Sequence, residues 1–113
     1  MAGMSTEEFE RQVISICSAS SVVRNMAVIN LGLTWFNVRA YLIDESFIDI
    51  FYNQTTGKTA FAHIRDERRI FGADNKQGWH WHPYDDPDEH LPAVNEIRFE
   101  EFLQQVEANI NKA

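Results

Sequence analysis

The first hydrophobic stripe along the chain predicts a helix over residues 5–18. Its apolar residues recur at i, i+4, i+7 and i+8, a spacing that places them on one face of a helix. They are Phe9, Val13, Ile16 and Cys17. The run Ser-Thr-Glu-Glu at 5–8 has the pattern of a capping box, so we expect the helix to begin at Ser5. Cys17 lies on the stripe, so we expect a buried small side chain and not a nucleophile.

From residue 20 to residue 84 the pattern changes to the two-residue alternation of β-strands. The six expected strands are 22–31, 35–42, 47–52, 58–65, 68–74 and 79–82. Connections between them are only two to five residues long, too short for a crossover between parallel strands. The sequence therefore predicts an antiparallel meander.

A second amphipathic helix is expected near the C-terminus, over residues 99–111. Its apolar positions are Phe99, Phe102, Leu103, Val106 and Ile110, at i, i+3, i+4, i+7 and i+11. The segment 85–95 before it contains two prolines and many acids, so we expect a loop there. Both helices can cover one face of the sheet. The predicted fold class is α+β, with an antiparallel meander of about six strands flanked by N- and C-terminal helices.

Composition adds limits to this picture. A chain of 113 residues with 44% hydrophobic and 24% charged residues is expected to form one soluble domain, residues 1–113. Its single cysteine excludes an intrachain disulfide and fits a reducing compartment. No apolar run approaches the roughly 20 residues of a membrane span, and the first ten residues lack the basic start of a signal peptide. We therefore expect a cytoplasmic protein without a membrane partner.

The charge balance disfavours one class of partner. Ten Lys and Arg residues against 17 Asp and Glu residues give a net charge of −7. Binding to nucleic acid depends on clustered cations that neutralise phosphates, so RNA is a disfavoured partner. A small local basic site remains compatible with this charge. Phosphate-binding loops, dinucleotide fingerprints and nucleophile elbows are absent from the sequence, and the cofactor stays unknown.

The chemistry is concentrated between residues 69 and 92. Three of the four histidines lie within 11 residues, and His80 and His82 alternate with Trp79 and Trp81 on the last expected strand. The two histidines should point to one face, with their Cβ atoms about 6.5–7 Å apart, and the two tryptophans should point to the other face. The tryptophans would then anchor the strand while His80 and His82 project from it, with His90 following in the loop.

Three interpretations of these histidines stay open. In the first, His80 and His82 bind a metal ion together with His90 or a carboxylate. In the second, the histidines do metal-free acid–base chemistry while Arg69, or its neighbours Arg65 and Arg68, holds a phosphate. In the third, they are solvated polar residues that form local ion pairs with nearby acids.

Asp74 and Asn75 precede a hairpin turn, so turn chemistry explains them without a catalytic role. The arginines at 65, 68 and 69 flank a tight turn with two acids between them. They are either a solvated hairpin tip or a small phosphate-binding patch on an acidic protein.

The stretches 69–75 (RIFGADN) and 78–83 (GWHWHP), followed by a further histidine, resemble the TumE-type family of toxin components. The layout is similar over residues 22–110. The resemblance implies a toxin that is paired with a small antitoxin protein and has suspected nuclease activity. The family residues carried over onto this sequence are Asp74, Asn75, His80, His82 and His90. This chain departs from the family in splitting its histidines as His80-x-His82 and in placing Ala73 before the Asp-Asn pair.

The leading hypothesis is a toxin-like protein that acts on RNA. His80 and His82 would be the acid and base, Arg69 would hold the scissile phosphate, and Asp74 and Asn75 would shape the adjoining turn. The first alternative is a non-catalytic module whose sheet binds a protein partner. The second is a metal-dependent hydrolase in which two or three of His80, His82, His90 and a loop acid bind Zn²⁺ or Mn²⁺. Whether the protein is an enzyme stays open at this stage.

Overall fold

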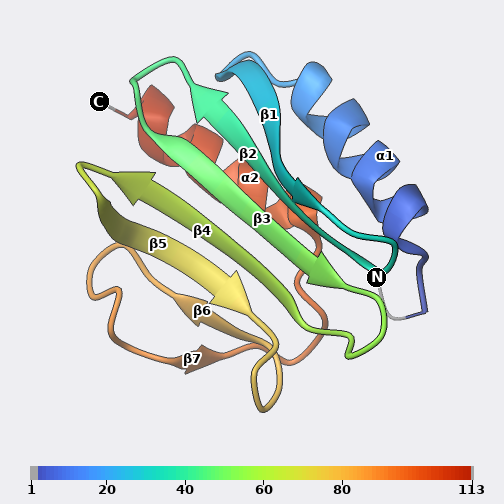
Figure 1. Cartoon of the computed structure of the whole chain (residues 1–113). Helices are drawn as coiled ribbons and strands as arrows, with labels where there is room; N and C mark the ends of the chain where they lie inside the picture. The colour runs from blue at the N-terminus through green and yellow to red at the C-terminus, as the bar shows by residue number, and fades with distance from the viewer. Residues whose placement is uncertain (1–2, 113) are drawn as a thin grey trace.

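In residues 3–112, which the computed structural model describes, two helices pack on one side of a seven-stranded sheet (Figure 1). The helices are α1 (Thr6–Ser18) and α2 (Phe99–Asn111). The strands are β1 (Val23–Leu31), β2 (Trp35–Leu42), β3 (Phe47–Asn53), β4 (Thr59–Arg65), β5 (Arg68–Asp74), β6 (His80–His82) and β7 (Leu91–Pro92). Each strand pairs antiparallel with its neighbour along the chain. The predicted α+β class, with helices at both ends of an antiparallel meander, is confirmed.

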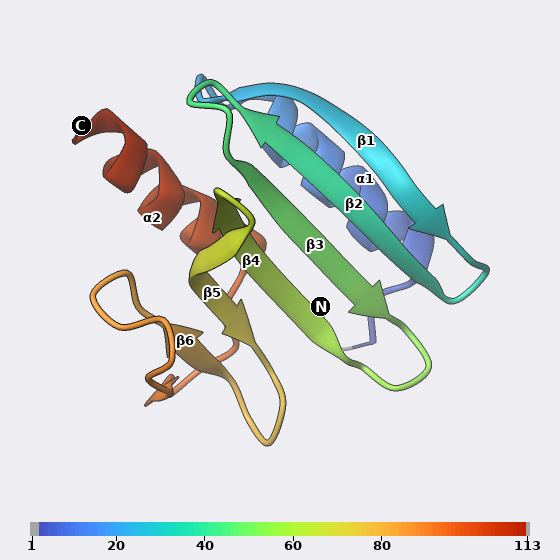
Figure 2. The same cartoon turned by 60° about the vertical axis from the view of Figure 1, so that its left-hand side comes forward.

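Both helices lie against the same face of the sheet, as the two views in Figures 1 and 2 show. α1 contacts β1 and β2, whereas α2 contacts β4. The Ser5 side chain caps α1 by accepting a hydrogen bond from the backbone N–H of Glu8 at 3.1 Å. Cys17 is buried on the inner side of α1, as expected. Neither helix in the described part of the chain is long and apolar enough to span a membrane.

The core lies between the helices and the face of the sheet that they cover. Every second residue of β2 and β3 points into it and is buried. These residues are Phe36, Val38, Ala40, Leu42, Ile48, Ile50 and Tyr52. The ring of Phe61 on β4 lies 6.4 Å from Phe9 of α1 and 5.4 Å from Phe102 of α2. One continuous core therefore joins both helices to the sheet.

A bulge in β5 changes which of its side chains share a face. The pairing of β4 with β5 shifts register between His63 and Ile64, and Ile70 is the extra residue. Strict alternation from the buried end of β5 would place Arg69 on the face that the helices cover. The bulge instead puts Arg69 opposite Ile64, on the open face of the sheet.

The strand count differs from the prediction, because residues 85–95 are not loop throughout. Leu91 and Pro92 form the short edge strand β7, with Leu91 opposite Trp81 and Pro92 opposite His80. Two exposed residues, one of them a proline, carry no alternation that could reveal a strand. β7 brings the loop between residues 83 and 90 back alongside β6.

Candidate functional site

β6 separates its aromatic side chains onto the two faces of the sheet. Trp81 points into the core, with its ring centroid 5.6 Å from Phe71 and 6.5 Å from Phe102. His80 and His82 lie on the opposite, open face, because they flank Trp81 in a strand. Both are nevertheless buried, with exposed fractions of 8% and 3%. No helix covers them, so the covering group must come from the chain that follows β6.

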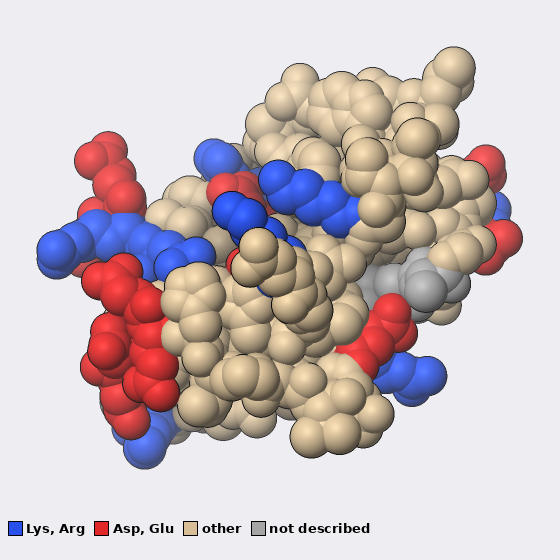
Figure 3. Space-filling view, turned by 90° about the horizontal axis from the view of Figure 1, so that it is seen from below, with Lys and Arg blue, Asp and Glu red and all other residues tan. Residues whose placement is uncertain are grey.

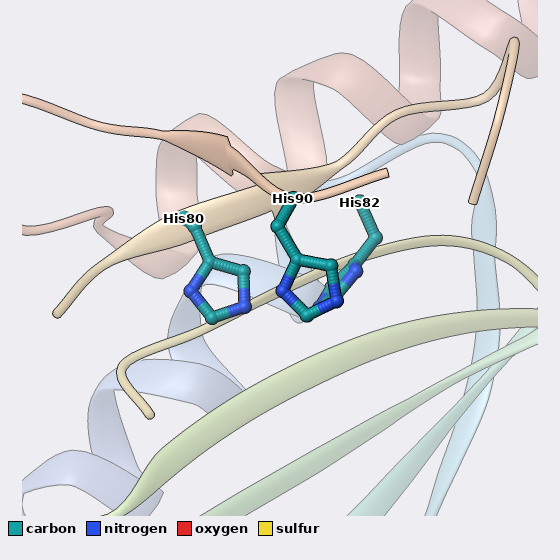
Figure 4. Close-up of side chains that lie close together, drawn as sticks. All are labelled: His80, His82 and His90. Atoms are coloured by element: carbon teal, nitrogen blue, oxygen red, sulfur yellow. The ribbon is translucent and has the colours of Figure 1, made fainter. Parts of the chain in front are cut away.

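The third histidine of the segment completes the cluster. His90 lies on the returning loop, and its ring centroid is 4.9 Å from that of His80 and 4.8 Å from that of His82 (Figure 4). One nitrogen from each of the three rings lies within 4.8 Å of the others. His90 is exposed, whereas the other two rings are buried beneath the surface. The structure therefore brings together His80, His82 and His90, from one strand and one loop.

Asp74 lies directly below this cluster, because β5 pairs it with His80. One carboxylate oxygen is 3.2 Å from Nε2 of His80 and the other is 3.0 Å from Nε2 of His82. Burial raises the pKa of Asp74, but the hydrogen bonds from His82 and from the Lys76 N–H, and the charges of both histidines, outweigh it. The pKa of Asp74 is therefore lowered, and the group is a carboxylate at neutral pH.

A neutral His80 ring has fewer N–H donors than the acceptors that face it. Its Nδ1 lies 3.1 Å from the Gly78 carbonyl oxygen, and its Nε2 faces the Asp74 carboxylate. Both partners are acceptors, whereas a neutral imidazole has a single N–H. If that proton is on Nδ1, then Nε2 and the carboxylate oxygen are two acceptors that face each other. If the proton is on Nε2 instead, Nδ1 faces the Gly78 carbonyl oxygen without a donor, so a neutral ring leaves one of the two contacts unsatisfied.

His82 has one nitrogen without a partner. Its Nε2 contacts Asp74, but its Nδ1 is buried and has no hydrogen-bond partner among the described residues. Buried polar atoms in native proteins are nearly always paired, so an unpaired one marks either strain or a missing ligand. Both buried histidines of the cluster are thus incompletely satisfied by the protein alone.

The loop over the cluster is attached to the sheet by Arg69. Its guanidinium donates a hydrogen bond to the Pro87 carbonyl oxygen at 3.0 Å. A Cβ placed on Gly72 would lie 3.1 Å from Cδ of Arg69 and 3.5 Å from Cδ2 of His82, so these side chains close over the glycine from two sides. The structure therefore places Arg69 beside the histidines, with its charged group bound to the loop.

Asn75 lies outside the cluster. Its side chain accepts a hydrogen bond from the Thr59 N–H at 2.9 Å and donates one to the Gly57 carbonyl oxygen at 2.8 Å. It thereby ties the β5–β6 turn to the β3–β4 hairpin. Asp74 also accepts from the Lys76 N–H at 3.0 Å, so it stabilises the same turn while it contacts the histidines.

The surroundings of the cluster are acidic. The loop after β6 carries four exposed acids, Asp85, Asp86, Asp88 and Glu89. In Figure 3 acidic side chains gather at the left-hand end, with Lys and Arg beside them; this is the end at which Figure 1 places the β4–β5 turn and the loop after β6. Such a field attracts cations and opposes the approach of a polyanion.

A second polar cluster, a hydrogen-bond network around the single histidine His63 that the sequence did not indicate, lies on the core side of the sheet. His63 is fully buried, with Nε2 2.8 Å from the Ser46 hydroxyl and Nδ1 2.8 Å from the Tyr84 hydroxyl. Ser46 donates in turn to Asp44, which also accepts from Arg65. The alternation along residues 59–65 places residue 63 on the buried face, and nothing else in the sequence indicates the network around it.

Every group in this second cluster has a compatible partner. Tyr84 donates to Nδ1 of a neutral His63, whose Nε2–H donates to Ser46. Burial, with a smaller effect of Arg65, lowers the pKa of His63 to about 4 against the opposing effect of Asp44. Burial likewise raises the pKa of the Tyr84 hydroxyl. This cluster is a satisfied structural network.

Comparisons with known proteins add no identity to the site. No family model, no curated protein and no solved structure matches the chain.

Proposed function

We propose that this protein binds a divalent transition-metal ion at the cluster of His80, His82, His90 and Asp74, and that the ion makes it a metal-dependent hydrolase. The observation that carries the proposal is that nitrogens of His80, His82 and His90 lie within 4.8 Å of one another, while Nε2 of His80 and Nε2 of His82 face the Asp74 carboxylate. Imidazole and carboxylate are the ligands that Zn²⁺ and Mn²⁺ share.

The distances to Asp74 fit a shared ion, and the imidazole nitrogens, up to 4.8 Å apart, would move closer together around it. Zinc–nitrogen bonds of about 2.0 Å in a tetrahedral site put neighbouring donor atoms roughly 3.3 Å apart. The carboxylate oxygens of Asp74 lie 3.2 and 3.0 Å from Nε2 of His80 and His82, close to that separation. Nδ1 of His80 contacts the Gly78 carbonyl, which is the second hydrogen bond that a metal-binding histidine commonly makes. His90 approaches from the exposed side, where a water molecule can join the ion.

Metal-bound water is a strong nucleophile near neutral pH, and that is the chemistry such an ion supplies. The protein residues hold the ion through two buried imidazoles on a rigid strand and one on a loop. The acids of that loop favour a neutral or cationic substrate over a nucleic acid.

The binding half of the proposal is tested by titrating the purified protein with ZnSO₄ and with MnCl₂ in a calorimeter. One ion per chain is expected, with binding lost in the double variant His80→Ala/His82→Ala. The matched control is His63→Gln, which removes the fourth histidine and should keep one ion per chain. Equal binding by the double variant, or no binding by the folded wild type, would overturn the proposal.

The second candidate is metal-free cleavage of RNA by acid–base chemistry, the activity that the resemblance to TumE-type toxins implies. One observation favours it. Arg69 and His82 flank Gly72, so the arginine side chain lies near the imidazoles. Arg69 would then leave the Pro87 carbonyl to hold a phosphate. An antitoxin protein would be its partner. The burial of His80 and His82 and the acidic loop both favour the metal over this candidate.

The two candidates are separated by an activity assay with and without EDTA. Purified protein is incubated with RNA and, in parallel, with p-nitrophenyl ester and phosphodiester substrates. RNA cleavage that survives EDTA and is lost in His80→Ala/His82→Ala would replace the metal proposal with acid–base chemistry. Hydrolysis that EDTA removes and Zn²⁺ or Mn²⁺ restores supports the metal-dependent hydrolase.

A further inference from the structure

The two edges of the sheet differ in length and in protection. β7 is two residues long and contains Pro92, so it offers little to a further strand. β1 is nine residues long, contains no proline, and has a strand on one side only among the described residues. Figure 1 shows it at the margin of the sheet, beside α1. An exposed edge of this length presents backbone donors and acceptors to another strand.

The unprotected edge is also apolar. Val28 and Leu31 on β1 are 52% and 60% exposed, and Leu33 in the following turn is 97% exposed. Ile29 is exposed beside them. Exposed apolar side chains along one strand indicate an interface, because scattered ones would not gather at a single edge.

The distribution of charge along the chain favours a second copy of the protein as the partner at this edge. None of residues 11–43 is Asp or Glu, although the chain contains 17 acids and has a net charge of −7. The only charged residue of β1 is Arg24. Two copies of an acidic protein repel each other wherever their acids meet, and this edge is a place where they do not meet. A second copy also brings an identical apolar strand, which can pair antiparallel about a two-fold axis and close the assembly.

We propose that the protein forms a symmetric dimer through antiparallel pairing of β1 with β1 of a second copy. The two sheets join into one continuous sheet, and the exposed side chains of β1 and its turn cover one another across the seam. The histidine cluster lies at the far end of the sheet, so each copy keeps its own cluster accessible.

Sedimentation equilibrium of the full chain tests this proposal. The expected mass is about twice the 13.1 kDa of one chain. The variant Val28→Lys brings one positive charge from each copy into the apolar seam and should raise the dimer dissociation constant by about 100-fold or more. The matched control is Val94→Lys, the same change at a valine that is 100% exposed outside β1, and it should sediment as the wild type does.

Hydrogen exchange of the wild type gives a second readout that needs no variant. Amides of β1 should exchange more slowly at high protein concentration than at low concentration, whereas the amide of Leu91 in β7 should not change. A monomer at all concentrations, a dimer that Val28→Lys leaves intact, or equal weakening by both lysine variants would overturn the proposal. A chain that pairs only with a different protein would overturn it as well.

Discussion

The histidine cluster and the network around His63 lie on opposite faces of the same sheet and differ in whether the protein satisfies their hydrogen bonds. On the core side His63 accepts from Tyr84 and donates to Ser46, so that both of its nitrogens are paired. On the open side His80 has two acceptors and one N–H, and His82 has a buried nitrogen with no partner among the described residues. A histidine that completes a network is structural, whereas histidines left incomplete together indicate a site that takes a ligand.

The covers of the two clusters differ as well. His63 lies in the core between the sheet and the helices, where packing fixes it. His80 and His82 lie under a loop that Arg69 ties to the sheet through one hydrogen bond to Pro87. The Tyr84–His63 hydrogen bond and the pairing of β7 with β6 hold the two ends of this loop, so only its exposed middle, around Pro87, can move at small cost.

The largest effect expected from this difference is metal-dependent stability. An ion that binds only the folded chain adds about 4 kcal/mol to the free energy of unfolding at a free concentration one thousand times its dissociation constant. Zn²⁺ should therefore stabilise the wild type and His63→Gln alike, measured by urea unfolding. His82→Ala should lose the increment. Equal stabilisation of His82→Ala by Zn²⁺ would place the ion elsewhere.

The next effect is a pH dependence that belongs to the core cluster. Unfolded histidine binds a proton near pH 6.5, whereas folded His63 does so only near pH 4. The stability that neutral His63 contributes is therefore complete above pH 6.5 and falls as the pH is lowered toward 4. The loss by pH 4 is about 3 kcal/mol. His63→Gln should lack this part of the slope in urea unfolding followed from pH 7 to pH 4, and parallel slopes would refute the assignment.

A smaller effect is expected when Asp74, the carboxylate beside His80 and His82, loses its charge. Asp74→Asn keeps the size of the side chain and its turn hydrogen bond but removes the anion that His80 and His82 share. Removing even an outer-sphere partner of a metal ligand typically weakens metal affinity by about 10- to 100-fold, so the loss of a carboxylate ligand should be at least as large. Calorimetry should show weaker binding with unchanged stoichiometry. Asn75→Ala, which alters the neighbouring residue of the turn outside the cluster, is the control and should leave the affinity unchanged.

The smallest effect concerns the attachment of the loop. Arg69→Ala removes the hydrogen bond to Pro87, which is worth about 1 kcal/mol. Metal dissociation should become about fivefold faster, because His90 lies on the loop that the substitution frees. The rate is measured by the transfer of Zn²⁺ to a chelator. Arg68→Ala removes an exposed arginine next to it and should leave the rate unchanged. A rate equal in both variants would show that the loop does not hold the ion.

Periodicity alone predicts most of the fold, because each element is defined by contacts between residues close in sequence. The stripe that ends at Cys17 and the alternation along β2 gave the right helix and the right buried face. The His-x-His pair likewise indicated two rings on one face. These features depend only on spacing, which the sequence displays directly.

The remaining features depend on pairing between distant positions. The bulge at Ile70 turns Arg69 to the histidine face and is set by the register against β4, which alternation cannot show. β7 exists because Leu91 finds a partner in β6, not because of its own pattern. The His63 network joins residues 17 and 21 positions apart in the chain, so the sequence indicated only that residue 63 points inward.

The order of the strands has a consequence for how the protein folds. Because every strand pairs with its neighbour along the chain, the contacts of the sheet are local, and such topologies fold fast for their size. The open histidine cluster is assembled from residues 74–90 alone. Closing so short a segment costs little chain entropy. We therefore expect these rings to meet as soon as β5 and β6 pair, before the C-terminal helix docks, so that an ion present during synthesis can be captured by a partly folded chain.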